Sequence, residues 1–122
     1  MMVQIGLDNK YYNNFSEIMR LNEEEEYTLE IDVLKNDGSQ YSFTGKTISA
    51  NLRLVNTVDV TDAFNVNATV VDLATGIFNV SLKDAFTNKG GKAYFVYWQL
   101  NNQTDNLQFN IYCGRLIIDK KL

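Results

Sequence analysis

Residues 92–118, KAYFVYWQL NNQTDN LQFNIYCGRLII, contain the stretch of sequence that decides the fold class. In an extended chain, successive side chains point to opposite faces. Tyr94 and Trp98 would therefore share one face of the first segment, and Phe95 and Tyr97 the other. Both faces are apolar and rich in aromatic residues, which indicates a central β-strand covered on both sides.

A hairpin follows this strand, because the polar residues 101–106 predict a loop and the alternating residues 107–118 predict a return strand with a bulge at Gly114. The same alternation recurs toward the N-terminus, in residues 27–33, 48–54 and 78–82. Turn signals such as Asp37-Gly38 and Thr75-Gly76 separate these segments, and no room is left for the helices that connect parallel strands. The sequence therefore predicts an all-β chain folded as an antiparallel β-sandwich of about seven or eight strands.

Residues 1–26 lack this regular alternation. Residues 10–21 fit either a helix or a strand, and the run Glu23-Glu24-Glu25-Glu26 is typical of a solvated loop. We therefore predict an N-terminal arm or assembly appendage at 1–26 and a β-sandwich domain at 27–122.

The composition excludes several classes of function. The 122 residues include no His and one Cys, so imidazole catalysis, an internal disulfide and a multi-thiolate metal site are not possible. The net charge of -4 argues against nucleic acid as a partner. No stretch is long and apolar enough to span a membrane or to serve as a secretion signal. We expect a soluble protein made in the cytoplasm, with neither nucleic acid nor membrane as a partner.

Few residues are candidates for chemistry. Glu30 and Asp32 would share one strand face, where acidic side chains are usually solvated. Cys113 has no His to activate it and is typical of a small buried side chain. We expect no enzymatic activity, no cofactor and no metal site, although the sequence leaves open whether a Ca²⁺ ion or a glycan is bound.

Two groups of residues are candidates for contacts with other molecules. The N-terminal arm carries apolar residues that a small sandwich does not need for its own core, and such an appendage often docks onto another chain or completes a sheet edge. These candidate assembly contacts are Val3, Ile5, Leu7, Tyr11, Tyr12 and Phe15. In the alternative interpretation, Trp98 and Tyr97 stack against a sugar, although aromatic residues in a sandwich more often form a core cluster. The 15 Asn residues fit either an AT-rich coding sequence or a hydrogen-bonding surface for sugars.

Four turn-and-strand motifs occur in a familiar order. Leu29–Leu34 runs into the turn at Asp37-Gly38, and Phe43-Thr44-Gly45-Lys46 precedes the alternating segment Ile48–Leu54. Thr75-Gly76-Ile77-Phe78 and Gly91-Lys92-Ala93-Tyr94 then open the next two strands. In this order, residues 27–119 resemble the N-terminal domain of phage baseplate upper proteins.

The resemblance implies an immunoglobulin-like sandwich and a non-enzymatic structural role in a bacteriophage virion, made in the host cytoplasm. The chain would be a baseplate or tail adaptor, a head fibre or a capsid decoration module. It would act in particle assembly through contacts with other virion structural proteins, as a homo-oligomer. The alternative function is a carbohydrate-binding or adhesin-type module for attachment to the host surface.

Overall fold

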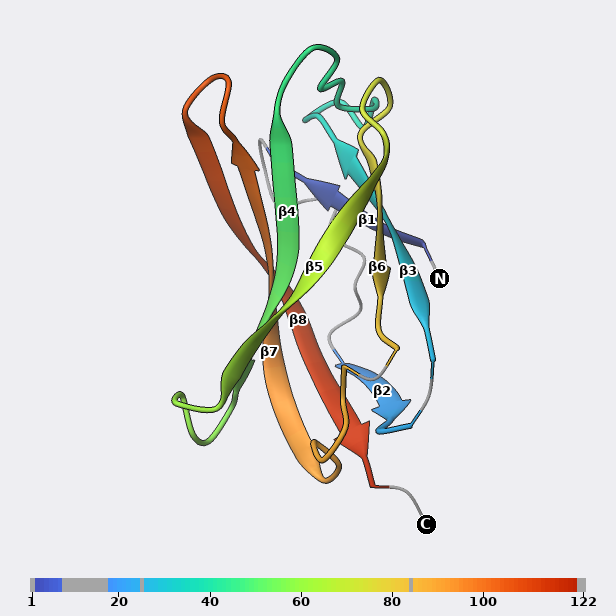
Figure 1. Ribbon diagram of the computed structural model, residues 1–122, viewed down its shortest axis with the longest axis vertical. Helices are drawn as coiled ribbons and strands as arrows, with labels where there is room; N and C mark the ends of the chain where they lie inside the picture. The colour runs from blue at the N-terminus through green and yellow to red at the C-terminus, as the bar shows by residue number, and fades with distance from the viewer. Residues whose placement is uncertain (1, 8–17, 25, 84, 121–122) are drawn as a thin grey trace.

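The computed structural model describes residues 2–7, 18–24, 26–83 and 85–120. These residues are all-β, with eight strands and no helix (Figure 1). The strands are β1 (Met2–Gly6), β2 (Ile18–Asn22), β3 (Thr28–Leu34), β4 (Ile48–Asn56), β5 (Ala63–Asp72), β6 (Ile77–Ser81), β7 (Lys92–Asn102) and β8 (Leu107–Asp119). None of the described residues forms a helix of the length and hydropathy needed to cross a membrane.

The eight strands form one curled, mixed sheet in the order β1-β3-β6-β5-β4-β7-β8-β2. β5 bends this sheet into two layers, because residues 63–67 pair with β4 and residues 68–72 pair with β6. Figure 1 shows β5 crossing obliquely between the strands of the two layers. The prediction of an all-β fold with seven or eight strands is confirmed.

The prediction that all strands pair antiparallel is wrong at both edges of the sheet. β1 pairs with β3 in parallel, and β2 pairs with β8 in parallel. Parallel strands usually need a long crossover connection between them, most often a helix. Here β2 lies between β1 and β3 in the sequence but at the opposite edge of the sheet, so the returning chain is itself a strand of the other layer.

The N-terminal strand β1 contributes directly to the core of the chain. Val3 and Ile5 are fully buried and Leu7 is 6% exposed, all three within the main hydrophobic cluster. The reasoning that the sandwich does not need these three residues is therefore wrong, because their side chains fill the space beneath the β1 edge. The division of the chain at residue 26 stays a prediction.

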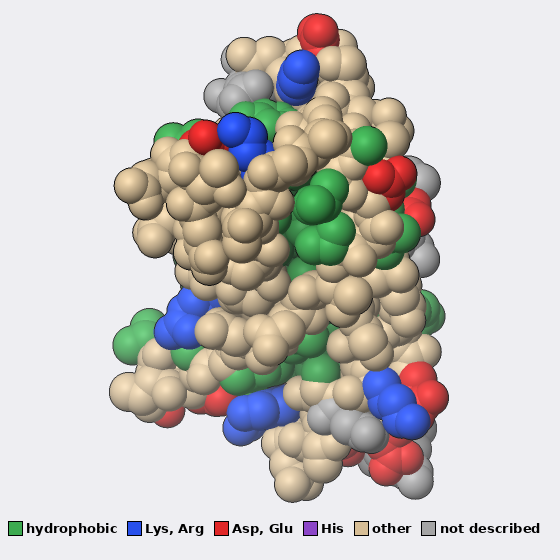
Figure 2. Space-filling view, turned by 45° about the horizontal axis from the view of Figure 1, so that its top comes forward, with side chains coloured by type: hydrophobic (Ala, Val, Ile, Leu, Met, Phe, Trp, Pro, Cys, Tyr) green, Lys and Arg blue, Asp and Glu red, His purple; other side chains and the backbone are tan. Residues whose placement is uncertain are grey.

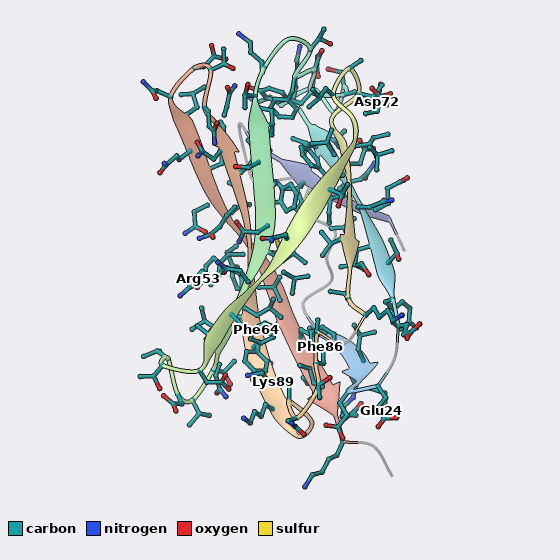
Figure 3. All side chains as sticks on the ribbon, in the orientation of Figure 1. Glu24, Arg53, Phe64, Asp72, Phe86 and Lys89 are labelled. Carbon is teal, nitrogen blue, oxygen red and sulfur yellow. The ribbon has the colours of Figure 1, made fainter. Side chains whose placement is uncertain are left out.

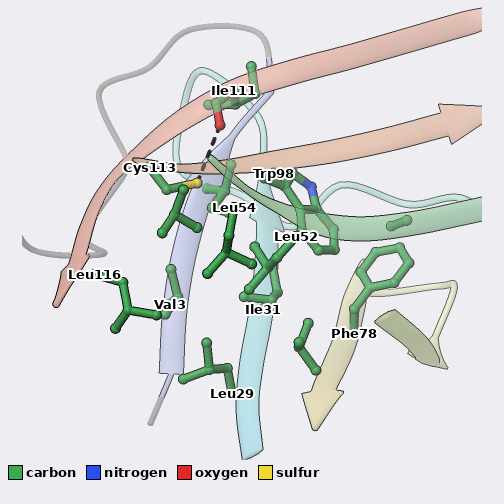
Figure 4. Packing of buried hydrophobic residues seen from close by; sticks show 14 of the residues in the cluster. Val3, Leu29, Ile31, Leu52, Leu54, Phe78, Trp98, Ile111, Cys113 and Leu116 are labelled. Atoms are coloured by element: carbon green, nitrogen blue, oxygen red, sulfur yellow. Dashed lines mark hydrogen bonds between the residues drawn. The ribbon is translucent and has the colours of Figure 1, made fainter. Parts of the chain in front are cut away.

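Aromatic rings join the two layers across the core. The ring of Phe78 on β6 meets the ring of Trp98 on β7 edge to face, with centroids 5.3 Å apart (Figure 4). The Phe43 ring also meets Phe78 edge to face, with centroids 6.2 Å apart. The outward side chains of β7, including Phe95 and Tyr97, are only half-buried. The expectation that β7 is covered on both sides is therefore wrong, since no described segment packs over its outer face.

The turns follow the sequence prediction more closely than some element boundaries do. Gly38 has a φ of 83° and closes the predicted turn, and the strand β8 bulges next to Gly114, where the pairing with β7 shifts register. The alternation of Tyr41 and Phe43 predicts a short strand, but residues 41–43 form none, although Phe43 is buried. The sequence of residues 83–87 predicts one helical turn, whereas residues 83 and 85–87 form turns. The alternation of Val66, Ala68 and Val70 predicts a strand that begins at Val66, but β5 begins at Ala63, because its first residues pair with β4.

Candidate interaction surfaces

Near the β7–β8 hairpin loop, the outer face of β4, β7 and β8 carries a group of side-chain amides. Strand alternation points every second residue of these strands away from the core, and the strand register aligns them in rows. Asn51, Gln99 and Asn110 form one row, and Ser49, Asn101 and Gln108 form the next. We call these six residues the amide face. None of them is charged.

The amide face is hollowed and internally hydrogen-bonded. The Asn51 amide nitrogen donates to the Gln99 amide oxygen at 3.0 Å, and the Gln99 amide nitrogen donates to the Asn110 amide oxygen at 3.4 Å. A hollow of about 410 Å³ lies over these residues. Its lining consists of the amide face together with Leu100 and Phe109.

Aromatic side chains border the amide face. Tyr97 on β7 and Tyr112 on β8 pair in the next row, with ring centroids 5.6 Å apart, and the ring of Phe95 lies 6.1 Å from that of Tyr112. Tyr112 is 43% exposed. Arg53 aligns with Tyr97, points outward from the sheet and donates to Asn65 at 3.2 Å (Figure 3).

The structure separates the two residues that the sequence suggested for sugar stacking. Trp98 is fully buried against Phe78, so its ring offers no face to a ligand. Tyr97 lies on the outer face beside Tyr112. Neighbours in a strand point to opposite faces, so Trp98 and Tyr97 cannot form one platform. For Trp98, the core interpretation is the one that the structure supports.

A second surface lies in the loop between β4 and β5, and we call residues 57–61 of this loop the β4–β5 tip. Its two valines are strongly exposed, Val58 at 92% and Val60 at 74%. The loop is nevertheless tightly hydrogen-bonded. The side-chain oxygen of Asn56 accepts from the backbone N–H groups of Val58 and Asp59, and the Asp59 carboxylate accepts from both the backbone and the hydroxyl of Thr61. The tip therefore presents two apolar side chains from a defined loop conformation.

Asp62 anchors the base of this tip to β7 and to the loop that precedes it. Its carboxylate accepts from the Tyr94 hydroxyl at 2.6 Å, the Asn56 amide at 3.0 Å and the Lys89 ammonium at 3.0 Å. The hydrogen bond from Tyr94, followed by those from Asn56 and Lys89, lowers the pKa of Asp62 well below the usual range for a carboxyl group. Lys89 also lies 4.9 Å above the Phe64 ring (Figure 3).

The other predicted candidates occupy varied positions. Tyr11, Tyr12 and Phe15 lie outside the described residues. Glu30 and Asp32 share the outer face of β3, and burial, together with the charge of Glu30, raises the pKa of Asp32. Burial raises the pKa of the Cys113 thiol to about 12, as expected for a core side chain.

Figure 2 shows one face of the molecule, on which charged side chains are scattered and uncharged polar atoms and backbone prevail.

No single sequence motif predicts the amide face or the Asp62 network. The amide face could have been found by placing the predicted outward residues of the hairpin side by side. The Asp62 network joins segments that no local pattern connects.

Of the comparisons with known proteins, the one with solved structures shows the fold. No model of a known protein family matches the chain, and no curated protein matches it significantly. Among solved structures, the chain is similar to the N-terminal domain of phage TP901-1 ORF48, with a TM-score of 0.63 and 14% sequence identity. The similarity covers 98% of this chain and 97% of that chain. At this identity the likeness shows that the two chains share their fold over nearly their whole length.

Proposed function

We propose that the chain is a non-enzymatic structural component of a bacteriophage virion. The observation that carries this proposal is the fold match along 98% of the chain to a domain of a phage protein. The turn motifs of residues 27–119, which resemble phage baseplate upper proteins, point to the same class of protein. The roles compatible with this proposal are a baseplate or tail adaptor, a head fibre and a decoration module.

An immunoglobulin-like arrangement is part of the proposal. The strands can be lettered A to G in chain order if β2 is left out. The sheet order β1-β3-β6-β5 then corresponds to the A-B-E-D sheet of an immunoglobulin domain, and β4-β7-β8 corresponds to its C-F-G sheet. In this assignment β2 is an additional edge strand beside the last strand. The departures are the parallel pairing of β1 with β3 and the sharing of β5 between the layers.

Particle assembly would use protein–protein contacts with other virion proteins and with further copies of the chain. Val3, Ile5 and Leu7 are occupied in the core, so their side chains are not available for such contacts. Among the predicted contacts, Tyr11, Tyr12 and Phe15 remain candidates. The β4–β5 tip adds Val58 and Val60, whose exposure suits insertion into an apolar depression on a partner.

The test compares variants for their incorporation into particles. Val58→Ser/Val60→Ser removes the apolar tip, Tyr11→Ser/Tyr12→Ser/Phe15→Ser removes the aromatic candidates, and Val71→Ser is the matched control on an exposed valine of β5. Each variant is supplied in trans during production of a phage that lacks the gene for the wild-type chain, and particles are purified on a density gradient. We expect at least one of the two multiple variants to stay folded and to be lost from the particle fraction, while the control is incorporated.

The assembly proposal is contradicted if both multiple variants are incorporated as well as the wild type. Deletion of residues 1–26 is not a clean alternative. It would remove β1 with its core residues and the β2–β8 pairing, so loss of folding would mimic loss of a contact.

A further inference from the structure

We propose that the amide face is a binding site for a neutral saccharide chain, with Gln99 and Asn110 at its centre. This site does not depend on the virion role, since it rests on the outer surface of β4, β7 and β8 alone. The hollow above it, about 410 Å³, falls within the range of ligand pockets, about 300–1,000 Å³.

Unused hydrogen-bonding capacity is the first support. A side-chain amide offers two N–H donors and a carbonyl acceptor, which matches the donor and acceptor character of sugar hydroxyl groups. One N–H of Asn51 is used in the hydrogen bond to Gln99, and one N–H of Gln99 is used in the hydrogen bond to Asn110. These two bonds fix the orientation of the three amides. Within the described part of the chain, the amide nitrogen of Asn110 and the side chains of Asn101 and Gln108 have no hydrogen-bond partner, so they are available to a ligand.

The amino-acid choice is the second support. Asn is depleted in β-strands, where Thr, Val and Ile are favoured. Even so, Asn51 and Asn110 flank Gln99 in one outward row, and Asn101 stands in the next row. Asn67 on β5 extends the row beyond Asn51. Thr would give a soluble strand face with a better strand propensity, so the repeated amides favour a hydrogen-bonding partner.

Charge and aromatic neighbours define the chemical class of that partner. The lining of the hollow holds no charged residue, which disfavours phosphate, nucleic acid and acidic sugars. It holds few of the aromatic and apolar side chains that make up the centre of a protein interface. Tyr97 and Tyr112 lie one row away, and the half-exposed ring of Tyr112 can pack against the C–H face of a pyranose.

The experiment screens the full chain on an array of neutral glycans that includes both cell-wall polysaccharides and glycoprotein-type oligosaccharides, with sialylated and phosphorylated glycans as charged comparisons. The best neutral binder is then titrated by calorimetry into the wild type and into Gln99→Val/Asn110→Val, which removes two amides but keeps strand-forming residues. Asn79→Val, an outward amide on β6, is the matched control. We expect the double variant to weaken binding at least tenfold and the control to leave it unchanged.

A second measurement keeps the test decisive if the double variant does not fold. In the wild type, the side-chain NH₂ signals of Gln99 and Asn110 should shift during an NMR titration with the same glycan, and signals from the β4–β5 tip should not. The saccharide site is refuted if no neutral glycan binds, if charged glycans bind better than neutral ones, or if the shifted signals map to another surface.

Discussion

Replacement of Tyr94 by Phe should destabilise the chain by removing the shortest hydrogen bond of the Asp62 network. Tyr94 is fully buried and its hydroxyl donates to the Asp62 carboxylate at 2.6 Å. A hydrogen bond to a charged group contributes about 1.5–3 kcal/mol. Asn56 and Lys89 remain as donors in the variant, so we expect the lower part of this range, about 1.5–2 kcal/mol.

Urea unfolding followed by the fluorescence of Trp98, the single tryptophan, measures this loss. For a slope of about 2 kcal/mol per molar urea, the midpoint should fall by about 1 M. Tyr97→Phe is the matched control on the same strand, because no hydrogen bond of the Tyr97 hydroxyl is seen among the described residues. The control should change the free energy of unfolding by less than about 0.5 kcal/mol.

The pH dependence gives an independent check. Because the folded chain lowers the pKa of Asp62, the contribution of this carboxylate is complete above its unfolded pKa of about 3.9 and is lost as the pH falls toward the folded value. The difference between wild type and Tyr94→Phe should therefore be constant near neutral pH and shrink below about pH 4. Equal midpoints for the two proteins at pH 7, or a difference that grows in acid, would refute the assigned role of the Asp62 network.

Three further predictions concern the core and the turns. Ile5→Ala should lower the free energy of unfolding by about 2–5 kcal/mol in urea titrations, because Ile5 is fully buried; a change below about 0.5 kcal/mol would mean that β1 is not part of the folded core. Gly76→Ala should destabilise more than Gly45→Ala, since both glycines have positive φ but only at Gly76 would the added Cβ collide with the Tyr41 carbonyl oxygen; equal melting temperatures would contradict this difference. The Cys113 thiol, with its pKa raised to about 12, should react with Ellman's reagent at pH 8 only as fast as the chain unfolds, so rapid labelling of the folded chain would contradict its burial.

The strands with local signals were predictable from the sequence. The β7–β8 hairpin follows from its alternating residues and its polar loop, and the Asp37-Gly38 turn follows from the positive φ that glycine allows. These features depend on neighbours in the sequence, which is why a single chain is enough to predict them.

Features that join distant segments were not predictable. The parallel pairing of β1 with β3 leaves no turn between the partners, so no sequence signal marks it. Because no local signal places β1 beside β3, the sequence predicts that Val3 and Ile5 lie outside the core, although both residues complete it. Asp62, Lys89 and Tyr94 come from separate loops and strands, and only the folded chain brings them together.

The proposed sugar site was predictable in part, because it combines local sequence signals with the pairing of distant strands. The aromatic residues of β7 and the abundance of Asn both suggest a sugar site in the sequence. The sequence interpretation, however, placed Tyr97 together with Trp98, whose side chain faces the core. The alternation rule alone could have corrected that pair. The rows that run through Asn51 and Gln99 required the β4–β7 register, which no local pattern specifies.

Quantitative mass spectrometry of gradient-purified phage particles tests the virion role most directly. The particles are produced from cells that express the native chain, and its peptides are compared across the gradient with those of the major capsid protein. We predict that the two sets of peptides peak in the same fractions at a constant ratio. A chain that stays with the soluble proteins at the top of the gradient, while intact particles sediment without it, would contradict the proposed function.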